Sequence, residues 1–155
     1  MAVETRYGEQ YAKYGTEPKE LVNVRTLHGR VRCLIDSVEI FNGDSAKSRY
    51  FVARLPSACI LLAQSEVHFD GIDGLGDIDF GNENDPNALI NAESLLRAGV
   101  ADAIQAIDIR RYGWPLWRML GYAKDPQKPI DLFFTLRDMA EKKGTLTVVL
   151  KYVID

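Results

Sequence analysis

Residues 130–155 have the sequence IDLFFTLRDMAEKKGTLTVVLKYVID, and their hydrophobic pattern is the strongest fold signal in the chain. Apolar side chains recur at every second position over 130–137 and again over 145–154. This period of two is typical of β-strands with one buried face. The charged link between the two segments ends in Gly144, so we expect the two strands to pair as a closing hairpin.

Further strands are expected upstream, in short segments that are rich in apolar or β-branched residues and bounded by Gly, Pro, Asn or Asp. In the first segment the apolar side chains lie at odd-numbered positions 31–35 and then at even-numbered positions 38–40. This change of phase predicts a bulge near residues 36–37. The expected strands are 30–41, 50–55, 58–69, 75–80 and 103–109.

One short helix is expected in the run NALINAESLLRA, residues 87–98. Asp85 can cap its first turn, Pro86 suits its first position, and Gly99 can end it. Seven or eight short strands with one brief helix predict an all-β fold, a β-sandwich. We favour the jelly roll because loops of mixed length join successive strands. An immunoglobulin-like sandwich fits less well, because both tryptophans follow both cysteines in this chain.

Residues 1–29 differ in composition from the sandwich domain expected over 30–155. Tyr7, Tyr11 and Tyr14 lie among charged residues and glycines, and their spacings of four and three would put the rings on one side of a helical turn. We interpret 1–29 as an extended N-terminal arm, loosely attached to its own domain. The tyrosines could dock on a neighbouring subunit, since each combines an apolar ring with a polar tip. Alternatively, the segment is a frayed terminus that contains tyrosines by chance.

The composition excludes several classes of protein. The chain has 155 residues, 46% of them apolar, and a formal charge of −3, which suits one globular domain rather than a disordered chain. A slightly acidic chain is poorly suited to nonspecific nucleic-acid binding, which depends on neutralising phosphates. No apolar run approaches the ~20 residues that span a bilayer. The first ten residues lack the apolar stretch of a signal peptide, so we expect neither a nucleic-acid nor a membrane partner.

The sequence contains no recognisable catalytic or metal-binding constellation. It has no G-x-S-x-G motif, and its two histidines, His28 and His68, lack the His-x-His spacing of cupin-type jelly-roll enzymes. We therefore expect no enzyme activity, no catalytic residue and no cofactor. Cys33 and Cys59 lie in apolar runs, as free buried thiols do, although a bridge between adjacent strands stays possible. The loop 70–85 is rich in Asp and Gly, which suits a solvated loop, a calcium site or, on a third hypothesis, an enzyme site.

The segment RRYGWPLWR, residues 110–118, mixes cations with aromatic rings. Trp114 and Trp117 could form a stacking platform for a sugar or a single-stranded nucleic acid. They could instead form a protein-binding hot spot, since Trp and Arg are enriched at such positions. The third interpretation, which we favour, is that one tryptophan anchors the core while arginine side chains lie over its ring.

Three apolar side chains are expected on the outer faces of their strands. Phe133, Val149 and Val153 have the parity opposite to the core-facing positions of the last two strands. Exposed apolar positions on strands are typical of surfaces that contact another protein. Together with the arm, they indicate a subunit that buries apolar and aromatic surface against copies of itself or other partners.

Four runs in roughly the last two-thirds of the chain form an ordered pattern: LPSACILLAQSEVHFD, IDFGNENDPNALINAESLLRAG, LWRMLGYAKDPQKPIDLFFTL and GTLTVVLKYVID. This pattern resembles a class of small structural proteins that tailed phages encode beside their capsid genes. In such proteins the segment similar to DFGNENDPNALI follows a strand and opens the helical piece, and the last run is the terminal strand. The resemblance implies a jelly-roll-like virion component without catalytic residues, and residues 1–29 lie outside it.

The function implied by this resemblance is that of a head decoration (cement) protein, or of a collar, neck or tail-associated component. We therefore expect a non-enzymatic virion protein that is assembled in the host cytoplasm and associates with itself, with a trimer favoured. Its partners would be the major capsid protein or other virion proteins. An alternative from another class is a carbohydrate-binding module that uses the two tryptophans. The residues expected to bind partners are Tyr7, Tyr11, Tyr14, Trp114, Trp117 and Phe133.

Overall fold

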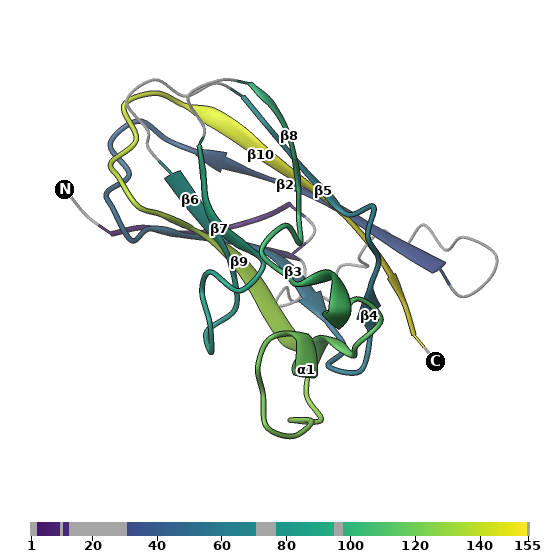
Figure 1. The fold of residues 1–155 in the computed structure, drawn as a ribbon. Helices are drawn as coiled ribbons and strands as arrows, with labels where there is room; N and C mark the ends of the chain where they lie inside the picture. The colour runs from purple at the N-terminus through teal and green to yellow at the C-terminus, as the bar shows by residue number, and fades with distance from the viewer. Residues whose placement is uncertain (1–2, 10, 13–30, 71–76, 95–97, 155) are drawn as a thin grey trace, which may run out of the picture.

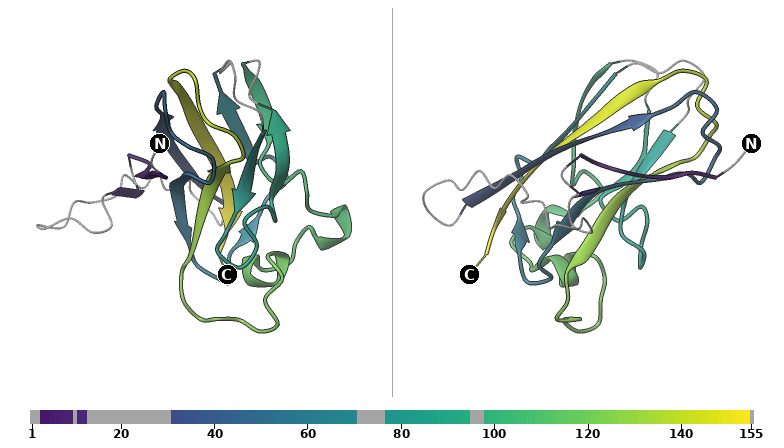
Figure 2. Two further views of the ribbon diagram at one scale, coloured as in Figure 1. Left: turned by 90° about the vertical axis from the view of Figure 1, so that its left-hand side faces the viewer. Right: turned by 180° about the vertical axis from the view of Figure 1, so that it is seen from behind.

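Two β-sheets face one another in this protein, as three views of the ribbon show (Figures 1 and 2). The coordinates are a computed structural model, which describes residues 3–9, 11–12, 31–70, 77–94 and 98–154. The strands are β1 (Thr5–Tyr7), β2 (Val31–Ile40), β3 (Arg49–Leu55), β4 (Ile60–Leu61), β5 (Glu66–Phe69), β6 (Asp77–Gly81), β7 (Ile90–Ser94), β8 (Gly99–Asp102), β9 (Ile130–Leu136) and β10 (Gly144–Val153). A 3-10 turn, η2 (Ile109–Arg111), and one helical turn, α1 (Leu116–Met119), lie between β8 and β9.

The strand order is that of a jelly roll. The first sheet has the order β1-β3-β9-β6-β7, and the second has the order β2-β10-β5-β8, with β4 also pairing with β10. Apart from β1 and β4, eight strands remain, four in each sheet, and every pair among them is antiparallel. Among these eight, consecutive strands lie in different sheets at every step except β6 to β7, as in the two interlocked Greek keys of a jelly roll. The all-β sandwich expected from the sequence is thus confirmed.

The core lies between the sheets and is formed by alternate side chains of their strands. Along β9 the buried inward side chains include Leu132 and Phe134, and along β10 they include Leu146, Val148 and Leu150. Phe80 of the neighbouring strand stacks on Phe134, with ring centroids 4.4 Å apart. The inward faces predicted for the last two strands are therefore confirmed.

The predicted pairing of these two strands is wrong. β9 pairs with β3 and β6 in the first sheet, whereas β10 pairs with β2, β4 and β5 in the second, so the charged link crosses between sheets. The period of two specifies which side chains point inward, but both sheets of a sandwich satisfy it equally well. The predicted bulge in β2 is also wrong, because β2 pairs with β10 in an unbroken register from Val31↔Val153 to Ile40↔Gly144.

The predicted helix over 87–98 is wrong as well, because its centre is β7, which pairs with β6. Asp85 and Pro86 begin a turn instead, in which the Ala88 N–H donates to the Asp85 carbonyl (3.1 Å). The short helical turn is α1, further along the chain, between β8 and β9. The strand expected over 58–69 is split into β4 and β5, and the strand expected over 103–109 is a series of turns.

Candidate interaction surface

The described part of the N-terminal arm is seated along one side of the sandwich, beside β2 and β3 (Figure 2). Strand β1 runs parallel to β3, and the Arg49 N–H donates to the Glu4 carbonyl (3.0 Å). The Gly8 N–H then donates to the Phe51 carbonyl in the first sheet (2.6 Å), and the Glu9 N–H donates to the Ser37 carbonyl in the second (3.1 Å). The arm therefore bridges the two sheets. The expectation of loose attachment is wrong for residues 3–9 and 11–12.

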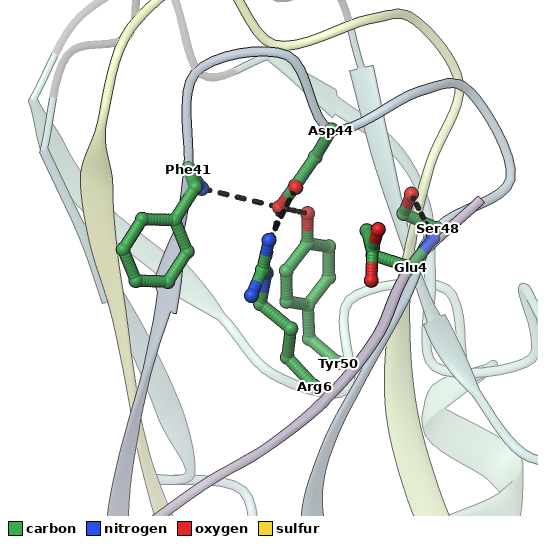
Figure 3. A network of polar contacts seen from close by, with 6 residues as sticks. All are labelled: Glu4, Arg6, Phe41, Asp44, Ser48 and Tyr50. Atoms are coloured by element: carbon green, nitrogen blue, oxygen red, sulfur yellow. Dashed lines mark hydrogen bonds and ion pairs between the residues drawn. The ribbon is translucent and has the colours of Figure 1, made fainter. Parts of the chain in front are cut away.

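An ion pair inside a polar network secures the first part of the arm (Figure 3). The Arg6 guanidinium donates to both carboxylate oxygens of Asp44, through Nε (3.0 Å) and Nη2 (2.7 Å). The Tyr50 hydroxyl and the Phe41 N–H also donate to this carboxylate, whose residue is 3% exposed. Burial alone would raise the pKa of Asp44. The hydrogen bonds from Arg6, Tyr50 and the Phe41 N–H outweigh it, and the pKa lies below its usual value. The carboxylate is thus held in its charged form.

Four aromatic rings form a second group of contacts between the arm and the first sheet. Tyr7 and Tyr11 stack in parallel (centroids 5.5 Å apart), and each contacts Phe51, which contacts Phe133 (4.8 Å). Phe133 points away from the core between the sheets, as its parity predicted, but it is only 1% exposed, so the expectation that it is exposed is wrong. Phe51 and the guanidinium of Arg49, 4.7 Å from the Phe133 ring centroid, lie against it. Alternation along β9 therefore predicted that Phe133 lies on the outer face of the sheet, but it could not predict that Phe51 and Arg49 cover the ring there.

Tyr11 connects the arm to a half-buried ion pair between Arg54 and Asp131. Its hydroxyl donates to Asp131 (2.7 Å) and accepts from Arg54 (3.2 Å), while Arg54 Nε donates to the same carboxylate (2.8 Å). Burial and the hydrogen bond to Asp131 raise the pKa of Tyr11 to about 12. The Tyr11 N–H also donates to the buried Asp36 (3.1 Å), and Gly8 lies so close to this carboxylate that a Cβ there would overlap it. Glycine at position 8 is therefore required by close approach.

A cleft of about 430 Å³ adjoins these aromatic rings on the outer face of the first sheet. Tyr7 and Tyr11 are among its lining residues, as are Phe51 and Phe133. The remaining lining residues come from two loops and the start of β9, namely Asn82, Glu83, Tyr122, Lys128, Pro129, Ile130 and Asp131. Of these lining residues, Tyr7, Tyr11 and Phe133 were expected from the sequence to bind partners, whereas nothing in the pattern places residues 82–83 and 122–131 beside the arm.

A second candidate surface is the outer face of the second sheet. Val31 (38% exposed) and Ile35 (47% exposed) point outward from β2, with the half-buried Cys33 between them. The register places Val153 opposite Val31 and Val149 opposite Ile35, and both of these valines are half-buried. We call these five residues the outer apolar strip. The change of phase that suggested a bulge reflects this strip, since β2 is apolar on its outer face at one end and on its inner face at the other.

The two tryptophans lie in and beside α1. The Trp117 side chain packs against the core, and the backbone N–H of this residue donates to the Ser57 carbonyl (3.0 Å). Trp114 is half-buried, with the Arg118 guanidinium 3.9 Å and the Arg111 guanidinium 5.8 Å from its ring centroid. One tryptophan thus packs on the core, as the favoured interpretation expected, but the arginines lie over the ring of the other tryptophan. Tyr14, the remaining candidate, lies outside the described residues.

The chemistry available elsewhere in the described residues is limited. Within them, no group of three His, Cys, Asp or Glu side chains is placed to hold a metal ion, although residues 71–76 of the acidic loop and His28 lie outside this description. Cys33 and Cys59 are free thiols, and burial raises the pKa of Cys59 to about 12. In the part of the chain that the structure covers, no helix has the length and apolar character needed to cross a membrane.

Chains in two phage capsid structures share this fold. One belongs to a structure described as the Cyanophage Pam1 capsid asymmetric unit, with a TM-score of 0.62 and 13% identity over 91% of this chain and 97% of that chain. The other belongs to the capsid of Ralstonia phage GP4, with a TM-score of 0.58 and 16% identity over 88% of this chain and 92% of that chain. No protein-family model and no curated protein matches the sequence. The similarity is therefore one of fold, and it extends over nearly the whole length of each chain.

Proposed function

We propose that this protein is a non-enzymatic structural component of a phage virion, and specifically a head decoration (cement) protein. The observation that carries the proposal is the fold shared, over nearly the full length, with chains of two phage capsids. The pattern of runs from Leu55 onward, which resembles phage structural proteins, is an independent argument from sequence. Its partners would be copies of itself, with a trimer favoured, and the major capsid protein.

The mechanism we propose is burial of apolar and aromatic surface at junctions of the capsid lattice. The outer apolar strip supplies aliphatic side chains on the outer face of the second sheet, and the cleft beside the arm supplies tyrosine rings. Each few hundred Å² of apolar surface removed from water contributes several kcal/mol at ~25 cal/mol per Å², before the cost of association. Many copies on one shell multiply such contacts, because each binding event raises the local concentration for the next.

In a collar, neck or tail-associated role, the same surfaces would contact other virion proteins instead of the major capsid protein. The carbohydrate-binding alternative gains no support from the tryptophans, since Trp117 packs against the core and a guanidinium lies against the Trp114 ring. On that alternative, Trp114→Ala would abolish glycan retention and leave assembly intact. On our proposal, the same substitution leaves binding to capsids unchanged.

The test is co-sedimentation of the purified protein with capsid shells that lack it, prepared from the phage that encodes it. We expect saturable binding at a fixed ratio to the major capsid protein, together with greater resistance of the shell to heat. Ile35→Asp places a charge in the outer apolar strip and should weaken binding or self-association, whereas Ile109→Asp, at an exposed position in η2, is the matched control. A monodisperse monomer by light scattering that also fails to sediment with shells would refute the proposal.

A further inference from the structure

We propose that assembled copies exchange their N-terminal arms, so that residues 3–9, 11 and 12 of one subunit occupy on a neighbour the socket that they occupy within a single chain. The arm socket consists of Asp36, Asp44, Phe51, Asp131 and Phe133. This inference rests on the proposed function, since it names the occupant of a surface through which the subunits would associate.

The arm and its socket are complementary in charge, shape and hydrogen bonding. Arg6 meets the buried Asp44 through two hydrogen bonds, and Gly8 lies where no side chain larger than hydrogen fits. Tyr11 fills the remaining part of the socket, between aromatic rings and a carboxylate. Every copy of the chain has the same arm and the same socket. The arm of a second copy can therefore make the same contacts with this socket.

The arm is also separable from the domain that it contacts. The cluster of buried residues between the two sheets includes neither Phe133 nor Tyr11, so the rings that hold the arm form a group apart from the core. Strand β1 is three residues long and is the edge strand of its sheet. Removing the arm from its own socket and seating it in a neighbour's breaks and remakes the same contacts, which is why exchange of an element is a low-cost route to association.

The connecting segment is long enough for exchange. Residues 13–30, eighteen in number, join the arm to Val31. Within one chain the gap to be closed is short, because the Glu9 N–H is bonded to Ser37, six residues along β2 from Val31, or about 20 Å at ~3.3 Å per residue. Eighteen residues reach up to about 60 Å when extended. A domain of this length has a radius of gyration of ~15 Å and so a diameter of about 40 Å, which leaves the socket of an adjacent subunit within reach.

The test is a disulfide that reports which chain supplies the arm. Thr5 and Arg49 are paired across β1 and β3, so cysteines there can meet the geometry of a disulfide. The variant Thr5→Cys/Arg49→Cys is made in a Cys33→Ala background, which removes the more accessible native thiol, keeps an apolar side chain in the outer apolar strip and leaves the buried Cys59. Shell binding by Cys33→Ala alone is the baseline. The assembled protein is oxidised and separated on a denaturing gel without reductant. We expect covalent oligomers that dithiothreitol returns to monomers, and a covalent heterodimer when the two single variants are co-assembled.

The matched control is Ser37→Cys/Thr147→Cys, which joins two strands inside one domain and should give only a monomer with altered mobility. If the arm pair gives only intrachain crosslinks, or none, in the assembled protein, arm exchange is wrong. Sedimentation with shells is measured on the same samples. Intrachain crosslinks with intact shell binding would overturn exchange alone, and interchain crosslinks without shell binding would overturn the virion role alone.

Discussion

Arg6→Ala removes one ion pair, with Asp44, and should lower the free energy of unfolding by about 2 kcal/mol at neutral pH. Loss of one partner from a fully buried pair costs roughly 3–5 kcal/mol, whereas an exposed pair contributes about 0–1 kcal/mol. The Arg6–Asp44 pair lies between these cases, because Asp44 is 3% exposed and Arg6 is 30% exposed. The Tyr50 hydroxyl and the Phe41 N–H would still donate to the carboxylate, and water can enter where the guanidinium lay.

The assay is urea unfolding, with Arg110→Ala as the matched control. Arg110 makes the same kind of paired contact with Asp108, but its side chain is 87% exposed, so we expect a small effect there. In a thermal melt of the same variant, a loss of 2 kcal/mol corresponds to a fall in Tm of about 4–8 °C for a domain of this size. Arg6→Lys keeps the charge without the paired geometry and should show an intermediate loss. Equal losses for Arg6→Ala and Arg110→Ala would refute the claim that burial of Asp44 makes its pair important.

The same pair gives a pH signature whose sign follows from the lowered pKa of Asp44. Because the folded-state pKa is below the unfolded value of about 3.9, the stabilisation is present above that pH and is lost as the pH falls through the folded-state pKa. The gap between wild type and Arg6→Ala should therefore be constant from about pH 5 to 8 and should narrow below about pH 4. A gap that persists unchanged at acid pH would mean that the arginine acts by packing rather than by charge.

Three further predictions concern the arm and the thiols. Gly8→Ala should unseat the arm and raise amide exchange at residues 8, 9 and 11, whereas Gly99→Ala, whose Cβ would meet only an aromatic ring at 3.6 Å, should not. Tyr11 should ionise near pH 12, so its contribution to stability is present below about pH 10 and is lost between pH 10 and 12. In a titration followed by tyrosinate absorbance, Tyr11→Phe should lack the rise near pH 12 that the wild type shows. Cys33 should react with a thiol reagent in the native protein, and Cys59 should react only after unfolding.

The inward faces of the last two strands could be predicted from sequence because they depend on local alternation. Leu132, Phe134, Leu146 and Val148 recur with a period of two, and each is buried. The sheet to which each strand belongs could not be predicted in this way. β9 and β10 are neighbours in sequence and have the same pattern, yet their partners are strands more than fifty residues away, which local pattern does not identify.

The aromatic arm likewise combines a feature that could be predicted from sequence with one that depends on tertiary structure. Tyrosines among charges and glycines indicated a segment that needs a partner surface, and Tyr11 is indeed buried. The surface itself is made by Phe51, Phe133 and Asp131 from two strands of the first sheet. Phe133 had the correct parity, but its exposure depends on what covers the outer face, and that is a tertiary property. The misplaced helix has a similar cause, because Asp85–Pro86 can begin either a helix or a turn.

The two candidate surfaces differ in what they can contribute to assembly. The arm is held by directional contacts. Arg6 donates to the buried Asp44, and the Tyr11 hydroxyl donates to the half-buried Asp131. A shift of one residue along the socket would break these hydrogen bonds. The outer apolar strip supplies mainly apolar area, with Lys151 of β10 opposite Cys33 in its middle, and apolar burial is non-directional, so the strip contributes little to register. Substitutions in the strip should therefore lower affinity in proportion to area. Substitutions in the arm socket should instead scramble which subunits are joined, and crosslinking patterns distinguish the two effects where binding constants alone do not.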